Sequence, residues 1–193
     1  MGKVTIIKKS RKECRCSKCG QVIPVGSQYY RGTLNFNPDI IRCNSCKLES
    51  WEVTTSDYQI NVGNIVYRWY ESFGSGESAP EEISSELESI RDELQDRLDN
   101  MPEGLQDADT GMILQERIEN LEDAMNELDN IDTDSLKQEV VDEYNQELED
   151  SDKEVEELDW DNPEQYADVM DITEALETKI SEAIDEALSV IEI

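Results

Sequence analysis

The sequence contains no histidine, and its 17 basic residues stand against 47 acidic ones over 193 residues. Without histidine, the chain lacks the side chain that most often acts as a general base near neutral pH, and any metal site has to use other ligands. The sequence also has no glycine-rich phosphate loop and no nucleophile in a recognisable catalytic setting. These absences predict a protein that is not an enzyme.

Long hydrophobic runs are missing as well. The opening segment MGKVTIIKKSRKE has a mostly apolar run of only four residues, Val4 to Ile7, which is too short for the core of a secretory signal. Ile6 stands where a myristoylation motif requires Ser or Thr, and no stretch approaches the ~20 apolar residues of a membrane span. We therefore expect an intracellular, cytoplasmic protein without a membrane partner.

Charge is divided unevenly along the chain. Residues 1–73 hold eleven basic and six acidic residues, a net of +5, whereas residues 74–193 hold six basic and 41 acidic residues, a net of −35. This change predicts a basic domain over 1–73, a linker over 74–80 (GSGESAP), an acidic helical hairpin over 81–131 and a second acidic helical pair over 132–193.

Two C-x-x-C pairs stand in the basic domain: Cys16 and Cys19, followed by Gly20, and then Cys43 and Cys46 after a gap of 23 residues. This spacing is typical of a zinc ribbon or a treble-clef-like finger, because each turn lets two thiolates reach one ion at about 2.3 Å. With no histidine in the chain, all four ligands have to be sulfur. We predict one structural Zn²⁺ ion, with iron as the second choice, since four cysteines close the coordination shell and leave no position for a substrate.

The fifth cysteine, Cys14, adds a competing ligand register, C-x-C-x-x-C. We predict that it is a free thiol beside the site rather than a ligand. The alternatives for the set as a whole are a redox C-x-x-C motif or buried thiols. A redox motif needs only one pair, and this sequence has two.

The remainder of residues 1–73 predicts a small α+β fold around the metal. The segments SQYYRGTL and IIRC indicate a hairpin whose turn, residues 35–39, contains Pro38. Ser56-x-x-Gln59 predicts the start of a helix over residues 56–72, although Gly63 weakens that prediction. The apolar face of this helix, which we expect to pack on the finger, is formed by Val62, Val66, Trp69 and Phe73.

Basic residues surround the first cysteine pair, with aromatic residues nearby. The candidate phosphate- or partner-binding residues are Lys8, Lys9, Arg11, Lys12, Arg15, Lys18, Tyr30 and Arg31. One interpretation is a nucleic-acid surface with stacking rings, a second is docking on the chain's own acidic region or on a second copy, and a third is a solvated or partner-facing surface.

The acidic region has the apolar spacing of amphipathic helices. The first predicted hairpin carries Ile83, Leu87, Ile90, Leu94, Leu98 and Met101 on one helix and Leu114, Ile118, Leu121, Met125 and Leu128 on the other, with Asp109 or Thr110 as the cap of the second. The second pair carries Leu136, Val140, Tyr144, Leu148, Val155 and Leu158 on one helix and Tyr166, Met170, Thr173, Leu176, Ile180, Ile184, Leu188 and Ile191 on the next. Asn162 is the expected cap of the last helix, and Pro163 its first residue.

These stripes are narrow, which is typical of a coiled-coil seam and consistent with a homo-oligomer. The sequence alone leaves open whether the helices close into a bundle or extend as hairpins. Acidic residues recur about once in three positions, so two paired helices present a charge about every 2.2 Å, against one per ~1.7 Å in duplex DNA. Mimicry of a nucleic acid is therefore one hypothesis, and simple solvation of acidic faces is the other.

The segments CSKCGQVIPVGSQYYRG, IIRCNSC and TTSDY, together with the hairpin LDNMPEGLQDADTGMILQERIENLEDAMNELDNI, resemble a group of small bacteriophage-encoded zinc-finger proteins. The resemblance covers roughly residues 10–131. It implies that Cys16, Cys19, Cys43 and Cys46 are zinc ligands and that the source is a phage or phage-like element. It carries no established function, and neither Cys14 nor the helices after residue 131 take part in it.

The sequence therefore predicts a non-enzymatic interaction protein of phage type. Our leading hypothesis is a zinc-stabilised head with acidic helices that bind a host protein complex, as a nucleic-acid mimic if that complex handles nucleic acid. The alternatives are a nucleic-acid-binding regulator that acts through residues 1–73 and a structural or assembly protein.

Overall fold

A computed structural model describes residues 3–34, 39–150, 158–166 and 170–191. The chain divides into two compact units, the first ending at Asn64 and the second covering Ile65–Glu192, so that the division falls within one helix, α1 (Asp57–Phe73). Each unit is described by itself below. The domain boundaries at residues 73, 80 and 131 stay predictions.

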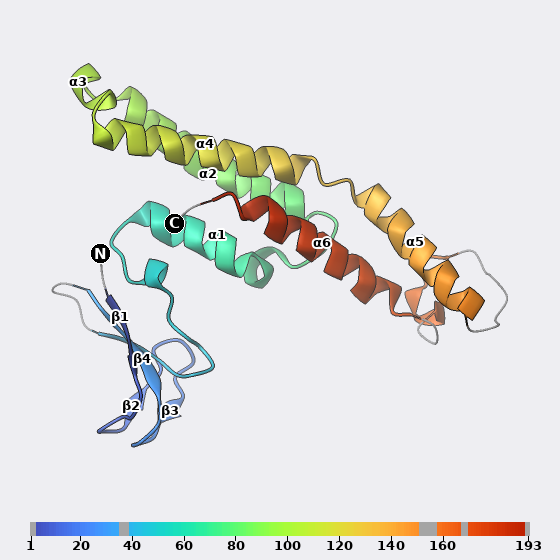
Figure 1. Cartoon of the computed structure of the whole chain (residues 1–193), viewed down its shortest axis with the longest axis horizontal. Helices are drawn as coiled ribbons and strands as arrows, with labels where there is room; N and C mark the ends of the chain where they lie inside the picture. Colours follow the sequence, from blue (N-terminus) through green and yellow to red (C-terminus); the bar gives the residue numbers. More distant parts are fainter. Residues whose placement is uncertain (1–2, 35–38, 151–157, 167–169, 192–193) are drawn as a thin grey trace. The chain divides into compact units, whose positions relative to one another are not determined.

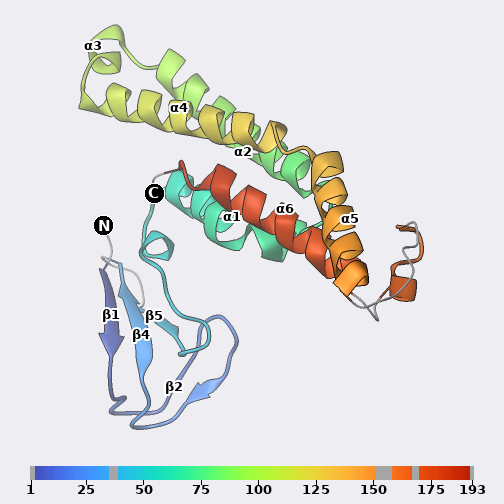
Figure 2. The ribbon, with the colours of Figure 1, turned by 45° about the vertical axis from the view of Figure 1, so that its right-hand side comes forward.

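The first unit is built on two small antiparallel sheets (Figure 2). The three-stranded sheet has the order β1-β4-β5, and the two-stranded sheet pairs β2 with β3. The strands are β1 (Lys3–Ile7), β2 (Cys14–Arg15), β3 (Val22–Ile23), β4 (Tyr29–Thr33) and β5 (Ile40–Arg42). The predicted hairpin is confirmed as the antiparallel pair β4-β5, although its predicted turn lies mostly in residues 35–38, outside the described residues.

Each face of the three-stranded sheet packs on a different part of the unit. On one face, a side chain at Gly32 would come within 2.7 Å of Leu48 and 2.8 Å of Val53, so these two buried residues cover the strand directly. On the other face, Tyr29 and Ile41 pack against the cysteine-containing core. Because successive side chains of a strand point to opposite faces, the sheet packs against two separate apolar clusters.

The predicted helix over 56–72 is confirmed as α1, and its beginning is capped as expected, with the Gln59 amide donating to the Ser56 hydroxyl at 3.4 Å. A short 3₁₀ helix (Ser50–Glu52) places Trp51 beside it. A Cβ atom at Gly63 would lie 2.5 Å from the Trp51 ring. The absence of a side chain at Gly63 therefore lets the indole ring lie against the helix. This contact accounts for a glycine at a helical position that helix propensity alone would disfavour.

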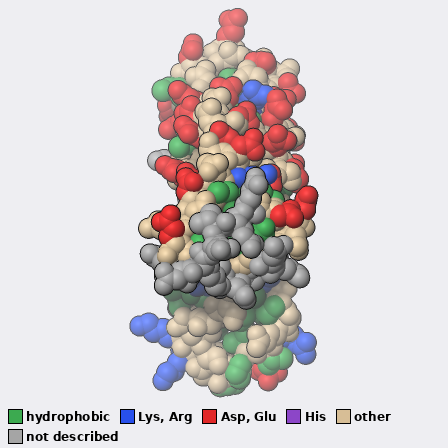
Figure 3. All heavy atoms as spheres, turned by 90° about the vertical axis from the view of Figure 1, so that its right-hand side faces the viewer, with side chains coloured by type: hydrophobic (Ala, Val, Ile, Leu, Met, Phe, Trp, Pro, Cys, Tyr) green, Lys and Arg blue, Asp and Glu red, His purple; other side chains and the backbone are tan. Residues whose placement is uncertain are grey.

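The second unit is helical in the part of the chain that the structure describes (Figure 1). α2 runs antiparallel to α4, and α6 packs against both α4 and α5. The elements are α2 (Ala79–Asp99), α3 (Glu103–Gln106), α4 (Asp109–Asp129), α5 (Thr133–Asp150), a 3₁₀ helix (Pro163–Tyr166) and α6 (Ile172–Leu188). The arrangement thus contains two helical pairs that are joined through α6. Acidic side chains far outnumber basic ones on the helices facing the viewer in Figure 3.

Most of the predicted apolar stripes form the core of this unit. Its largest fully buried side chains are Ile83, Leu87, Leu94, Leu121, Leu128, Val140, Ile172, Ile180, Ile184 and Leu188. The structure adds Ala124, which is fully buried between its larger neighbours on α4. None of the described helices combines the length and the apolar content that a membrane span requires.

Several details of the helix predictions are wrong. α4 is preceded by Ala108, which makes no side-chain cap, instead of by Asp109 or Thr110. Pro163 begins a 3₁₀ helix rather than α6, which starts nine residues later with Asp171 as its side-chain cap. Leu158 lies outside any helix, and Val155 falls outside the described residues. Thr173 is exposed, because its neighbour Ile172 occupies the buried position.

Candidate metal centre

Two turns of the first unit carry the paired cysteines. The turn from Cys16 to Cys19 lies between β2 and β3, and the turn from Cys43 to Cys46 follows β5. In the first, the Gly20 amide donates to the Cys16 carbonyl at 3.0 Å, and in the second the Cys46 amide donates to the Cys43 carbonyl at 3.2 Å. Both turns therefore fold back on themselves and bring their two sulfur atoms to the same side.

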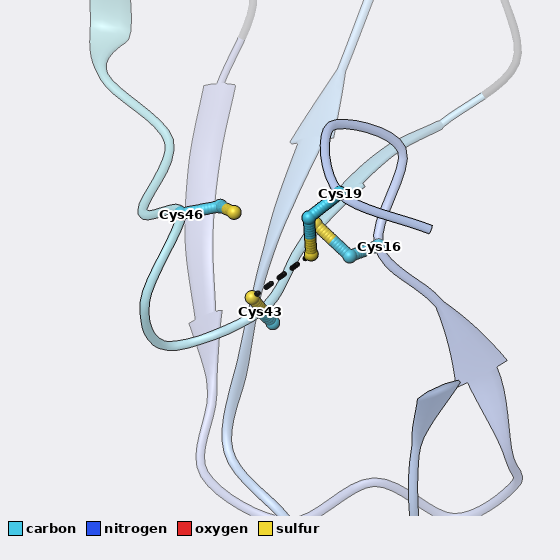
Figure 4. Close-up of side chains that lie close together, drawn as sticks. All are labelled: Cys16, Cys19, Cys43 and Cys46. Atoms are coloured by element: carbon cyan, nitrogen blue, oxygen red, sulfur yellow. Dashed lines mark hydrogen bonds between the residues drawn. The ribbon is translucent and has the colours of Figure 1, made fainter. Parts of the chain in front are cut away.

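The four sulfur atoms converge on one point (Figure 4). The Sγ atoms of Cys16, Cys19, Cys43 and Cys46 all lie within 4.8 Å of one another, and those of Cys19 and Cys43 are 3.8 Å apart. Four sulfurs at about 2.3 Å from a tetrahedral ion lie about 3.8 Å from each other. The cluster therefore has the dimensions to hold one metal ion.

Hydrogen bonds fasten the first turn to the strand that leads into the second. The Ser17 amide donates to the Ile41 carbonyl at 2.7 Å, and the Ile41 amide donates to the Ser17 hydroxyl at 3.1 Å. This reciprocal pair fixes the distance between the two cysteine turns independently of the sulfur atoms. A cation would consequently find its ligands already close to their bound positions.

The environment separates the acidities of the thiols. Burial opposes ionisation of Cys16, but backbone hydrogen bonds around Cys19 and Cys43 outweigh it and lower the pKa of Cys16 to about 6. The pKa of Cys43 is also lowered, against the effect of its burial, by hydrogen bonds around Cys46. Hydrogen bonding to Cys19 and Cys43 raises the pKa of Cys46 to about 12. Binding of a cation to all four sulfurs therefore has to displace a proton from Cys46, which makes metal affinity rise with pH.

The cysteines also form part of the hydrophobic core. Cys16 and Cys43 are only 2% and 7% exposed, and with Ile23 they make up the buried cluster on this side of the unit. Cys14, on β2, packs against this cluster and lies outside the group of four. This placement agrees with the prediction of a thiol beside the site.

Lys47 is a functional neighbour that sequence reasoning missed. It follows the second pair as Gly20 follows the first, and both residues have positive φ, 24° for Lys47 and 71° for Gly20. Glycine adopts such a conformation without the steric cost of a Cβ atom, whereas lysine does not. The position directly after each C-x-x-C pair could have indicated this residue, because φ is positive there in both turns.

The structure places six of the candidate basic residues, Lys8, Lys9, Arg11, Lys12, Arg15 and Lys18, at exposed positions on or between β1 and the first cysteine turn. The loop that carries several of them is held by two backbone bonds, from Ser10 to the Ser27 carbonyl at 2.8 Å and from Gly26 to the Ser10 carbonyl at 2.9 Å.

Tyr30 and Arg31 do not belong to a common surface. Successive residues of a strand point to opposite faces, so these neighbours on β4 diverge. Arg31 pairs with Asp39 at 2.6 Å, and the hydrogen bond to Asp39 raises the pKa of the guanidinium group. The candidate set therefore divides into an exposed loop cluster and two residues that face apart.

The chain thus combines a small antiparallel α+β unit around a four-cysteine cluster with a separate unit of acidic helices. Comparison with family models, curated proteins and solved structures finds no match.

Proposed function

We propose that this protein is a non-enzymatic, phage-type accessory protein whose acidic helices bind the basic surface of a host complex that handles nucleic acid. The first unit holds one structural Zn²⁺ ion. The sulfur separation supports zinc, since four thiolates around a closed tetrahedral site are its usual structural environment and leave no position for a substrate.

The observation that carries the proposal is the charge on the antiparallel pair α2–α4. The two helices have 21 residues each, with eight acidic residues on α2 and seven on α4, and all fifteen are exposed. Each helix is about 31 Å long, so the pair presents one carboxylate about every 2.1 Å along its axis. Duplex DNA presents one phosphate charge per ~1.7 Å. A DNA-binding surface would therefore meet a similar density of negative charge on the α2–α4 pair and on DNA.

The few basic residues of the pair neutralise little of this charge. Arg91 lies 2.9 Å from Asp92 and 3.2 Å from Glu88. Arg97 lies 3.7 Å from Glu93. Four exposed acidic residues of α4 follow one another at helical spacing: Glu116, Glu119, Asp123 and Glu127. We call them the α4 acidic stripe.

The test is a pull-down from bacterial lysate with the immobilised full-length protein. We expect retained proteins that bind nucleic acid and that are displaced by duplex DNA, because both ligands compete for the same basic surface. Neutralising the α4 acidic stripe (Glu116→Gln, Glu119→Gln, Asp123→Asn, Glu127→Gln) should abolish retention. The matched control neutralises four exposed residues of α6, Glu174, Glu177, Glu182 and Glu186. The proposal is contradicted if the stripe variant retains the same proteins as the α6 control. It is also contradicted if duplex DNA does not displace the retained proteins.

The second candidate function is nucleic-acid binding through the first unit. It is favoured by the six exposed basic residues near the first cysteine turn. Electrophoretic shift of the full-length protein on DNA and RNA should then weaken steeply with salt, and Lys8→Ala with Lys9→Ala and Arg11→Ala should reduce it. No shift at low salt excludes this alternative.

A further inference from the structure

The turn between α2 and α4, together with the first turn of α4, exposes apolar side chains on a region that is otherwise acidic. Leu105 is 51% exposed, Met112 59% and Ile113 46%. Among the described residues, these are three of the nine large hydrophobic side chains with high exposure, and they fall within nine consecutive positions. We call Leu105, Met112 and Ile113 the hairpin tip.

The hairpin tip is held in a defined conformation. The Gln106 side chain donates to the carbonyl oxygens of Leu98 at 3.1 Å and Met101 at 2.9 Å, which caps the end of α2. A Cβ atom at Gly111 would overlap the Gln106 carbonyl, so α3 packs directly on the first turn of α4. The close packing and the two capping bonds fix the backbone on both sides of the exposed residues.

Carboxylates flank the apolar residues at helical spacing. Asp109 lies three residues before Met112 and four before Ile113, and Glu116 lies four and three residues after them. Residues three or four apart share a helix face, so the exposed apolar pair lies between two exposed carboxylates. Met112 also continues the spacing of the α4 acidic stripe, which begins at Glu116. Leu105 lies on α3 and has exposed acidic residues close to it in the sequence, Glu103 and Asp107.

We propose that the hairpin tip is the apolar anchor of the partner-binding surface, and that its partner is a cationic amphipathic segment whose apolar side chains are flanked by Lys or Arg. This inference rests on the proposed function and adds a contact that charge mimicry alone does not require. Two hairpin tips of separate copies do not fit each other, because they would bring Asp109 and Glu116 of both copies together with like charges. A partner with cations on both sides of an apolar residue satisfies both features of the surface.

The experiment measures fluorescence anisotropy of two labelled peptides with the full-length protein. One peptide is an amphipathic helix with leucine on one face and lysine on the other, and the second has serine in place of each leucine. The anchor variant carries Leu105→Ser, Met112→Ser and Ile113→Ser. The matched control carries Val25→Ser and Val190→Ser, which are 66% and 41% exposed and lie outside the tip. Far-UV circular dichroism verifies that both variants keep the wild-type helix content.

We expect the wild type and the control to bind the leucine peptide more tightly than the serine peptide. The anchor variant should lose about ten-fold in affinity for the leucine peptide and bind the serine peptide as the wild type does. The difference should persist at about 0.5 M salt, because apolar contacts are not screened. Neutralising the α4 acidic stripe should weaken the binding of both peptides.

Two outcomes overturn the inference and are distinguishable. If the wild type binds both peptides equally and the anchor variant behaves in the same way, the hairpin tip is not an anchor, although the acidic surface still binds cations. If neither peptide binds the wild type, the proposed function and the anchor fail together.

Discussion

The two units keep their folds by different means. In the first, the buried cluster beside the sheets consists of Cys16, Cys43 and Ile23, so potential metal ligands provide most of the apolar interior there. In the second, leucine and isoleucine side chains from α2, α4, α5 and α6 fill the core. We therefore expect a bound cation to contribute strongly to the stability of the first unit, whereas apolar side chains at helical spacing stabilise the second.

The largest effect expected from this comparison is the loss of the first unit on removal of the metal. Chelation should unfold it, since structural zinc contributes on the order of 10 kcal/mol to domains of this kind. Near-UV circular dichroism should change because Trp51 lies in the first unit, while the far-UV helical signal should largely remain.

A pair of variants identifies the ligands. Cys43→Ser should reduce bound zinc to near zero by elemental analysis, and Cys14→Ser should leave it unchanged, because Cys14 lies outside the four-cysteine group. An unaltered near-UV spectrum after chelation would show that the first unit does not depend on the metal.

The corresponding perturbation of the second unit is a cavity in its core. Leu121 is 0% exposed, and Leu121→Ala should lower the free energy of unfolding by about 3 kcal/mol. Thermal melting followed at 222 nm measures the effect, and Gln115→Ala, at an exposed position of α4, is the control. Zinc content should not change. A simultaneous loss of zinc would show that the stability of the two units is not independent.

A smaller effect is expected where α1 meets Trp51. Gly63→Ala improves helix propensity by about 1 kcal/mol, but the new methyl group would lie 2.5 Å from the indole ring and should cost roughly 1–3 kcal/mol. We therefore expect lower stability by denaturant titration followed by tryptophan fluorescence. Gly104→Ala, where a Cβ atom meets nothing within 4 Å, should be neutral or stabilising. Equal stabilisation by both substitutions would contradict the proposed contact.

The smallest effect concerns Lys179, which joins α6 to α5 through Glu143 at 2.9 Å and Glu139 at 3.0 Å. Hydrogen bonds to Glu143 and Glu139 raise the pKa of Lys179 above its ordinary value of 10.5. The stabilisation is therefore complete below the unfolded pKa and is lost as pH rises through the folded one. Because both glutamates are more than half exposed, Lys179→Met should cost only about 0.5 kcal/mol.

The pH dependence provides the measurement for Lys179. The difference in melting temperature between the wild type and Lys179→Met should be present at about pH 8 and shrink as the pH rises above the ordinary lysine pKa of 10.5. Lys137→Met is the comparison variant, since Lys137 pairs with Glu77 at 2.6 Å and does not join α5 to α6. A difference for Lys179→Met that grows with pH would exclude the ion pair as its cause.

Prediction from the sequence succeeds where a pattern is local. The C-x-x-C spacing leads to the four-cysteine group, and the three- and four-residue steps of leucine and isoleucine lead to the buried faces of the helices. Prediction from the sequence fails where several residues are equally suited to begin a helix. Pro163 is suited to the first turn of an α-helix and occupies the first turn of a 3₁₀ helix instead, while Asp171 caps α6.

By itself, the sequence determined the cysteine group, the α1 helix, the antiparallel pair β4-β5 and most of the helical core, because each depends on residues a few positions apart. The tertiary structure decided the roles of Gly63 and Gly111, the partners of Lys179 and the exposure of the hairpin tip. Gly63 meets a ring from another element, Gly111 meets the backbone of α3, and Lys179 meets carboxylates of α5. These contacts, and the side chains left uncovered, are fixed only when the separate elements pack together.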